Sequence, residues 1–277
     1  KKFSVALPSA QEWKSGLQCY QGSFVLFVSS ALLLLHQNVD IFFLKFFRGD
    51  TAVGVYDYCY RYALFVFLLG GSLSEPLRRQ LARLKEQGAE LQSTRLILSC
   101  HKILGTMSAG FLLFSILFAD FLFSKIVPIE VDFSTSRLLV LFACWLMVSF
   151  FSVPWSEWLI SQSKKKYLAL SIIAGVANLG FNLSLVPTYG IYGAVIAKIC
   201  SESCIFTYLF FSVTSEKRRQ FLKVFYIHIL LVPCVACFWK TGSVPLWLAV
   251  ATVAIEALVI VFTKYLSKHD LQVLARN

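Results

Sequence analysis

Apolar stretches of about 20 residues recur along this whole chain, and each is long enough to cross a hydrocarbon core of about 30 Å. Only 15% of the 277 residues are charged, against about 25% in an average soluble domain. A soluble protein with this many apolar helices would have too few polar residues to cover its surface. The sequence therefore predicts a polytopic membrane protein.

We expect an all-α protein with about eight transmembrane helices. A membrane-spanning chain must pair its backbone groups internally, and these runs lack the alternation of β-barrel strands. The predicted spans are residues 24–47, 53–73, 96–123, 138–160, 168–187, 191–213, 221–239 and 244–262.

Lys and Arg are unevenly divided between the two sides that these spans define. If both termini are cytoplasmic, 19 of them lie on the cytoplasmic side, and five lie opposite: Lys45, Arg48, Lys125, Arg137 and Lys240. Because cytoplasmic loops are rich in Lys and Arg, this orientation is favoured. The same distribution explains the net charge of +11 without nucleic acid as a partner.

The longest cytoplasmic connection covers residues 74–95. Leu77, Leu81 and Leu84 recur there at helical spacing among basic residues. This pattern predicts an amphipathic helix on the inner leaflet, where basic side chains meet anionic lipids. The alternative is a cytoplasmic extension of the second span.

Six polar residues lie in the outer halves of the first two spans, and we expect them to form one outward-facing cluster: His36, Gln37, Asn38, Asp40, Asp57 and Arg61. Charges inside spans are unfavourable, so Asn38, Asp40, Asp57 and Arg61 are candidates for substrate binding. Arg61 offers a planar fork to a phosphate or carboxylate, with Asp40 and Asp57 orienting it. Alternatively, Asp57 and Arg61, four residues apart, neutralise each other at the membrane surface.

Four further charged residues lie in later spans. Lys198 and Glu202, four apart in the sixth span, form either a structural pair or part of a substrate site. Glu157 in the fourth span and Glu256 in the eighth are candidates for binding a coupling ion, H⁺ or Na⁺, although a helix-end acid is more often interfacial.

Motifs for enzyme, metal or cofactor chemistry are absent from the sequence. The eight Cys mostly lie in or beside apolar runs, where packing is a simpler explanation than a metal or redox site. Polar chemistry confined to spans is typical of transport, so we predict a protein that is not an enzyme.

The fifth and sixth spans contain a motif with fixed spacing, made up of Asn178, Asn182, Pro187, Tyr189, Gly190, Gly193, Ala194 and Ala197. In order and spacing it resembles a helix pair of the polysaccharide exporters, in the multidrug/oligosaccharidyl-lipid/polysaccharide flippase superfamily. Physically, Pro187 ends one helix, and Gly190 and Gly193 allow the next to start tightly and pack closely.

A second stretch resembles the same family. It contains Asp40, Gly49, the segment Val53-Gly54-Val55-Tyr56, and Tyr60-Arg61. The resemblance covers most of residues 11–213 and implies that 24–213 form a MATE-like C-terminal six-helix lobe. Residues 1–23 would be a cytoplasmic or interfacial lead-in, and 214–277 two extra helices with a cytoplasmic tail. In related lipid II flippases an Arg of the equivalent helix lines the central cavity, which implies a substrate role for Arg61.

The resemblance implies a flippase for an undecaprenyl-pyrophosphate-linked oligosaccharide, such as an O-antigen or capsular repeat unit. Its cationic cavity would bind the head group while the lipid tail stays in the bilayer of a bacterial or archaeal inner membrane. Rival interpretations are a MATE-type drug or cation antiporter, a glycan polymerase or ligase, and a structural membrane subunit. Because the chain starts at Lys1 without Met, we also expect an upstream part that precedes it.

Overall fold

A computed structural model describes residues 10–126, 133–214 and 218–219 of the chain. This part of the chain is helical and contains no strand. Its long elements are α1 (Ala10–Arg48), α2 (Asp50–Gly71), α3 (Ser74–Glu86), α4 (Glu90–Ile126), α5 (Phe133–Gln162) and α6 (Lys164–Ser212).

Five segments of the described residues are long and apolar enough to cross a membrane: Ser23–Arg48, Asp50–Glu86, Glu90–Phe118, Ser136–Gln162 and Lys164–Ser212. The prediction of an all-helical protein with membrane-type helices is therefore confirmed for this part. The predicted spans 221–239 and 244–262 lie outside the described residues, so the total of eight stays a prediction.

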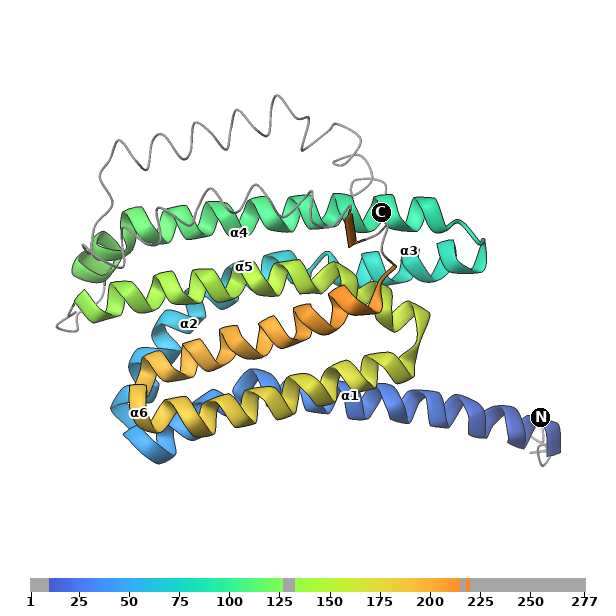
Figure 1. Cartoon of the computed structure of the whole chain (residues 1–277), viewed down its shortest axis with the longest axis horizontal. Helices are drawn as coiled ribbons and strands as arrows, with labels where there is room; N and C mark the ends of the chain where they lie inside the picture. Colours follow the sequence, from blue (N-terminus) through green and yellow to red (C-terminus); the bar gives the residue numbers. More distant parts are fainter. Residues whose placement is uncertain (1–9, 127–132, 215–217, 220–277) are drawn as a thin grey trace, which may run out of the picture.

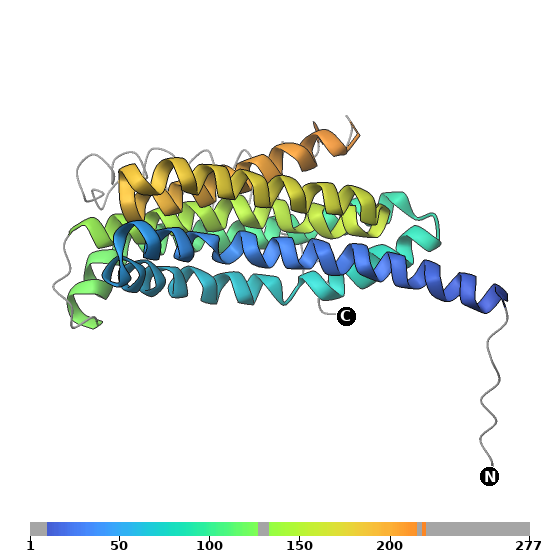
Figure 2. The ribbon, with the colours of Figure 1, turned by 90° about the horizontal axis from the view of Figure 1, so that it is seen from below.

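The helices lie alongside one another in a bundle (Figures 1 and 2). α1 packs along α6, and α5 packs against both α4 and α6. The α1–α2 turn and the bend of α6 are at one end of the bundle, while α3 and the α5–α6 turn are at the other (Figure 1).

The 49-residue helix α6 contains two of the predicted spans. A straight helix of that length would extend about 74 Å, more than twice a hydrocarbon core. Gly190 bends it, with φ 58° and ψ −128°, a backbone conformation that favours glycine. The bend divides α6 into a first arm before Gly190 and a second arm after it. A Cβ on Gly193 would overlap the carbonyl group of Leu185, so the two arms approach closely. The predicted tight turn is present.

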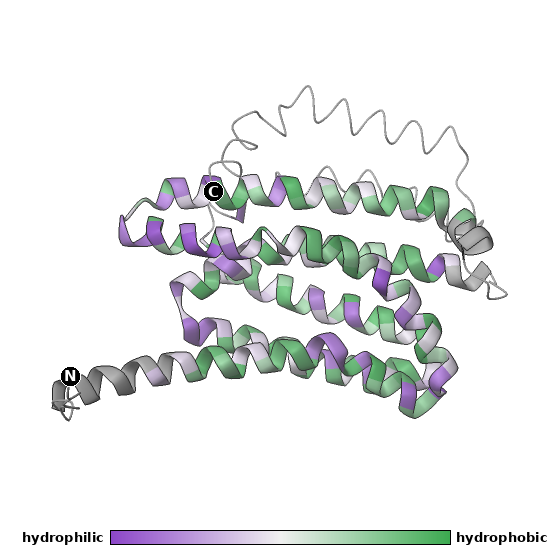
Figure 3. Ribbon diagram, turned by 180° about the vertical axis from the view of Figure 1, so that it is seen from behind, coloured by the Kyte–Doolittle hydropathy of each residue, from purple (hydrophilic) through white to green (hydrophobic). Residues whose placement is uncertain are grey.

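Large apolar side chains cover much of the outside of the bundle. On α1 the exposed ones include Phe24, Phe27, Leu34, Leu35, Phe42 and Phe46, and on α6 before Gly190 they include Ile172, Val176, Leu179 and Leu183. Figure 3 shows the hydrophobic colouring along the long helices, with hydrophilic residues gathered at α3 and the start of α4. Contiguous exposed apolar surface is unusual for a soluble monomer and suits contact with lipid or another protein.

The leucine face of α3 packs against protein. Leu77 and Leu81 are buried in one cluster with Trp155 and Leu159 of α5. Lys85 Nζ donates to the last carbonyl groups of α5, at 2.7 Å from the Ser161 oxygen. The apolar face of α3 is thus used for packing in the bundle, and this favours an extension of the second span over a helix lying on the leaflet.

Candidate functional site

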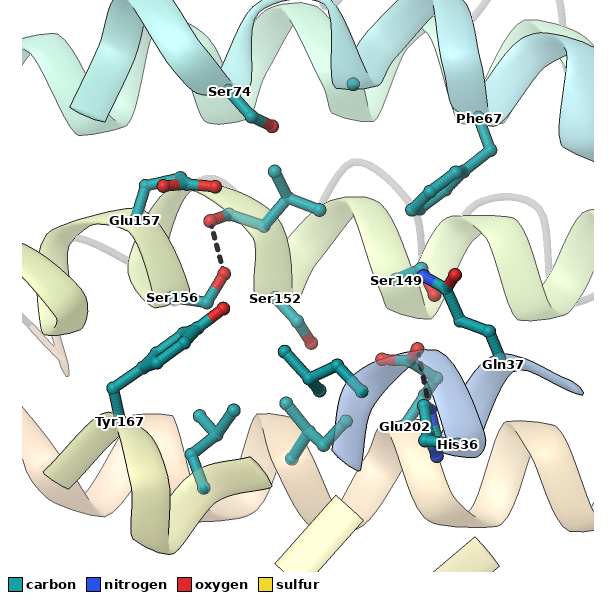
Figure 4. Close-up of a pocket in the computed structure, with 15 residues that line it drawn as sticks. His36, Gln37, Phe67, Ser74, Ser149, Ser152, Ser156, Glu157, Tyr167 and Glu202 are labelled. Atoms are coloured by element: carbon teal, nitrogen blue, oxygen red, sulfur yellow. Dashed lines mark hydrogen bonds and ion pairs between the residues drawn. The ribbon is translucent and has the colours of Figure 1, made fainter. Parts of the chain in front are cut away.

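A partly polar cavity of about 220 Å³ lies between α1, α2, α5 and α6, with Ser74 at the start of α3 also lining it. Leu33, Phe67, Val153, Leu170 and Ile205 form its apolar wall. Its polar lining residues are His36, Gln37, Ser74, Ser149, Ser152, Ser156, Glu157, Tyr167 and Glu202 (Figure 4). None of the described residues that line it is Lys or Arg. This lining can therefore donate to and accept from a polar ligand but does not present a cation to it.

At one side of the cavity, His36 of α1 faces Glu202 of α6, with Nε2 3.5 Å from Oε1 (Figure 4). Ser149 of α5 and Gln37 lie beside them in the same view. Among the described residues, His36 Nδ1 and Ser149 Oγ have no hydrogen-bond partner, although these side chains are buried. Buried polar groups are nearly always satisfied, so these two point to a ligand.

At the other side lie Glu157, Ser156 and Tyr167 (Figure 4). The Glu157 carboxylate is held by two parallel hydrogen bonds from Arg78 of α3, Nε to Oε2 at 2.6 Å and Nη2 to Oε1 at 3.1 Å. A bidentate pair of this kind fixes both side chains. The geometry gives Glu157 a structural partner and links α3 to α5.

One helix turn from His36 and Glu202, a fully buried ion pair joins α1 to the part of α6 after Gly190. Lys198 Nζ donates to Asp40 Oδ2 at 2.5 Å and to the Gln37 carbonyl oxygen at 3.0 Å. Tyr56 Oη of α2 also donates to Asp40 Oδ2, at 2.5 Å. Lys198 is 1% exposed and Asp40 0%. Because buried charges need partners, this pair is a fixed element of the bundle.

The surroundings of this pair complete its bonding. The Lys198 ammonium lies 5.1 Å from the ring centre of Tyr60 and 5.5 Å from that of Trp145, within cation–π range. Asn178 donates to the His36 carbonyl oxygen and, at 3.2 Å, to Asp40 Oδ1. Asn182 in turn donates to Asn178 Oδ1 at 2.7 Å. Asn178 therefore joins α6 to α1, and Asn182 supports Asn178 from within α6.

The two charged residues of α2 lie elsewhere. Arg61 pairs with Asp57 through Nε at 2.8 Å and Nη2 at 2.7 Å, and the Arg61 side chain is 74% exposed. Neither residue lines the cavity. Asn38 is exposed and donates to the Leu34 carbonyl oxygen of its own helix. The expected single cluster is thus divided between the cavity, the buried pair and the outer face of α2.

Two pairings differ from the spacing-based predictions. Lys198 pairs with Asp40 instead of Glu202, and Asp40 does not orient Arg61. Of the predicted site residues, Glu157 and Glu202 line the cavity. Glu256 lies outside the described residues. His36 and Gln37, which the sequence placed in the polar cluster without a role of their own, also line it. Ser149 and Tyr167 were missed as lining residues, because a serine or an aromatic in an apolar run carries no signal of its own.

In the described part of the chain, no group of three or more His, Cys, Asp and Glu could hold a metal ion. Comparison with protein-family models, with curated proteins and with solved structures found no match for this chain. The class of protein thus depends on the bundle and its cavity: a helical protein with membrane-type helices and a polar site inside.

Proposed function

We propose that this chain belongs to a transport protein that moves a lipid-linked oligosaccharide across a membrane. The observation that carries the proposal is the polar cavity between helices long and apolar enough to cross a membrane. Polar residues at membrane depth are unfavourable and are typically found where a transporter holds its substrate or its coupling ion.

The chemistry of the cavity supports a hydroxyl-rich substrate. Serine, tyrosine and glutamine side chains donate and accept in the same way as sugar hydroxyls, and a carboxylate accepts from them strongly. Phe67 and Leu33 add apolar surface, as in most small-molecule sites. The motif of Asn178 to Ala197 supports the same proposal, since the bend at Gly190 gives it a physical meaning in this fold.

A drug or cation antiporter is the second candidate, and the cavity gives a specific reason for it. Glu157 and Glu202 line the cavity, while none of the described lining residues is Lys or Arg. The resemblance implies a cationic cavity, which would disfavour a cationic substrate. The cavity described above does not have that character, so this objection to a cationic substrate does not apply to it. Arg78 already neutralises Glu157, which leaves Glu202 and its partner His36 as the groups that a cation would meet.

The test is translocation in proteoliposomes. The purified chain is reconstituted with undecaprenyl-pyrophosphate linked to a fluorescent oligosaccharide, and a membrane-impermeant quencher reports how much label reaches each leaflet. We expect transfer between leaflets that exceeds that in protein-free liposomes. Uptake of a lipophilic cation without transfer of the labelled lipid would favour the antiporter.

A further inference from the structure

We propose that the cavity side formed by Ser149, Glu202, His36 and Gln37 is a subsite for the neutral sugar part of a ligand, and that it excludes the phosphate part. The proposal rests on the proposed function and divides the substrate between two places. Sugar hydroxyls enter the cavity, while a phosphate group stays outside it.

The first step is the sign of the charge. Glu202 presents a carboxylate to the cavity, and among the described lining residues there is no Lys or Arg to offset it. Arg78 is paired with Glu157, and the buried Lys198, one helix turn from Glu202, is engaged by Asp40 and the Gln37 carbonyl oxygen. An anionic pyrophosphate would meet like charge in a setting of low dielectric, where repulsion is strong. A neutral group with hydroxyls would not.

The second step is the unused hydrogen-bonding capacity. Ser149 and His36 are 2% and 3% exposed, yet Ser149 Oγ and His36 Nδ1 have no partner among the described residues. Ser152 and Ser156, by contrast, donate to carbonyl oxygens of their own helix. Sugar hydroxyls both donate and accept, so a sugar in the cavity can give these lining residues the partners that they lack.

The third step is size. At about 220 Å³ the cavity is somewhat smaller than the roughly 300–1,000 Å³ of sites that take drug-sized ligands. That size suits one sugar residue. The cavity would therefore recognise a single residue of the oligosaccharide.

Three amphiphiles with the same dodecyl tail test this by their heads: dodecyl maltoside is neutral and sugar-bearing, dodecyl phosphate anionic, and dodecyltrimethylammonium cationic. Binding to the chain in nanodiscs is measured by titration calorimetry, with empty nanodiscs as the blank. The variants are Ser149→Ala and Glu202→Gln, with Ser161→Ala as a matched control. Ser161 lies on the same helix outside the cavity and donates to the Trp158 carbonyl oxygen.

We expect Ser149→Ala to weaken dodecyl maltoside binding about three- to tenfold, the loss of one hydrogen bond. Since Ser149 Oγ has no partner among the described residues, its removal should not lower the melting temperature. Glu202→Gln should weaken maltoside binding about tenfold, because a charge-assisted acceptor becomes neutral. Ser161→Ala should leave the affinity unchanged.

Equal maltoside affinity in Ser149→Ala and Ser161→Ala would overturn the subsite. Tighter binding of dodecyltrimethylammonium than of dodecyl maltoside would also overturn it, if Ser149→Ala leaves the affinity for the cation unchanged. That result would support the antiporter. The translocation assay separates this outcome from the proposed function. If the labelled lipid is transferred but neither cavity variant changes maltoside binding, only the subsite is refuted. If the variants weaken maltoside binding but no lipid is transferred, only the transport proposal is refuted.

Discussion

Asp40 and Lys198 form a fully buried ion pair that joins α1 to α6. Residue spacing pointed to Glu202 as the partner of Lys198, since residues four apart share a helix face. The structure instead joins Lys198 to a residue 158 positions away. A pairing between distant helices depends on how the helices pack, and local spacing in one sequence does not contain that information.

Removing one member of this pair should destabilise the protein strongly. Lys198→Met leaves Asp40 buried without its cation, and Asp40→Asn leaves Lys198 buried without its anion. Each variant should therefore lower the unfolding free energy by about 3–5 kcal/mol. The double variant should cost less than the sum of the two, because no uncompensated charge remains. The measurement is the unfolding free energy in mixed micelles.

The exposed pair of Lys45 and Asp50 provides the control. Its side chains are 68% and 83% exposed, so Lys45→Met should change stability by less than about 1 kcal/mol. Additive effects of Lys198→Met and Asp40→Asn would show that the two charges do not depend on each other.

Arg61 is predicted to contact substrate. It lies near the middle of α2 with its side chain 74% exposed, and an exposed charge at that depth is unfavourable in lipid by about 2.5–3.5 kcal/mol. This face of α2 should therefore meet water, a ligand phosphate or another polypeptide. We expect Arg61→Ala to abolish glycan export at near-normal protein levels, and Arg61→Lys to restore it in part, because lysine cannot grip two phosphate oxygens. Full export by the alanine variant would leave Arg61 as a partner of Asp57 only.

At the level of elements, the sequence was informative where one residue dictates the backbone. Gly190 and Pro187 predicted the bend of α6, and hydropathy placed both ends of α2, α4 and α5 within about six residues of the observed ends. For α1 only the C-terminal end was predicted closely, because the helix begins at Ala10, well before the predicted span at residue 24. The orientation of α3 was less accessible. Its leucine spacing is the same whether that face meets lipid or α5, and only the observed packing of Leu77 and Leu81 decides between them.

The close approach of the two α6 arms predicts a sharp difference between two glycines of one helix. A Cβ at Gly193 would overlap the Leu185 carbonyl, while one at Gly180 meets nothing within 4 Å. Gly193→Ala should cost about 1–3 kcal/mol through overpacking, and Gly193→Leu should prevent stable folding or abolish function. Gly180→Ala should be neutral or slightly stabilising, since alanine favours a helix. Melting temperatures of the purified variants check this, and equal values for the two alanine variants would refute the close approach.

For the molecule as a whole, the bundle brings basic segments of different helices to one end. Lys85 of α3 bonds the last carbonyl groups of α5, and this places α3 beside Lys164–Lys166 at the start of α6. Arg48 lies at the opposite end, where its Nη2 donates to the Pro187 carbonyl oxygen at 2.6 Å beside the α6 bend. The alternation of basic and less basic connections that the sequence predicted is consistent with this arrangement.

The positive-inside rule then predicts which end faces the cytoplasm. The end with α3 and Lys164–Lys166 should be cytoplasmic, together with both termini, and the α6 bend should face outward. Two substitutions at opposite ends of the first arm of α6 test this: Lys165→Cys and Thr188→Cys. In intact cells a membrane-impermeant maleimide should label Thr188→Cys above the level of the unsubstituted chain, because Thr188 is exposed at the bend. Lys165→Cys should be labelled only after the cells are permeabilised, and its labelling in intact cells would reverse the orientation, placing the basic end, α3 and both termini outside.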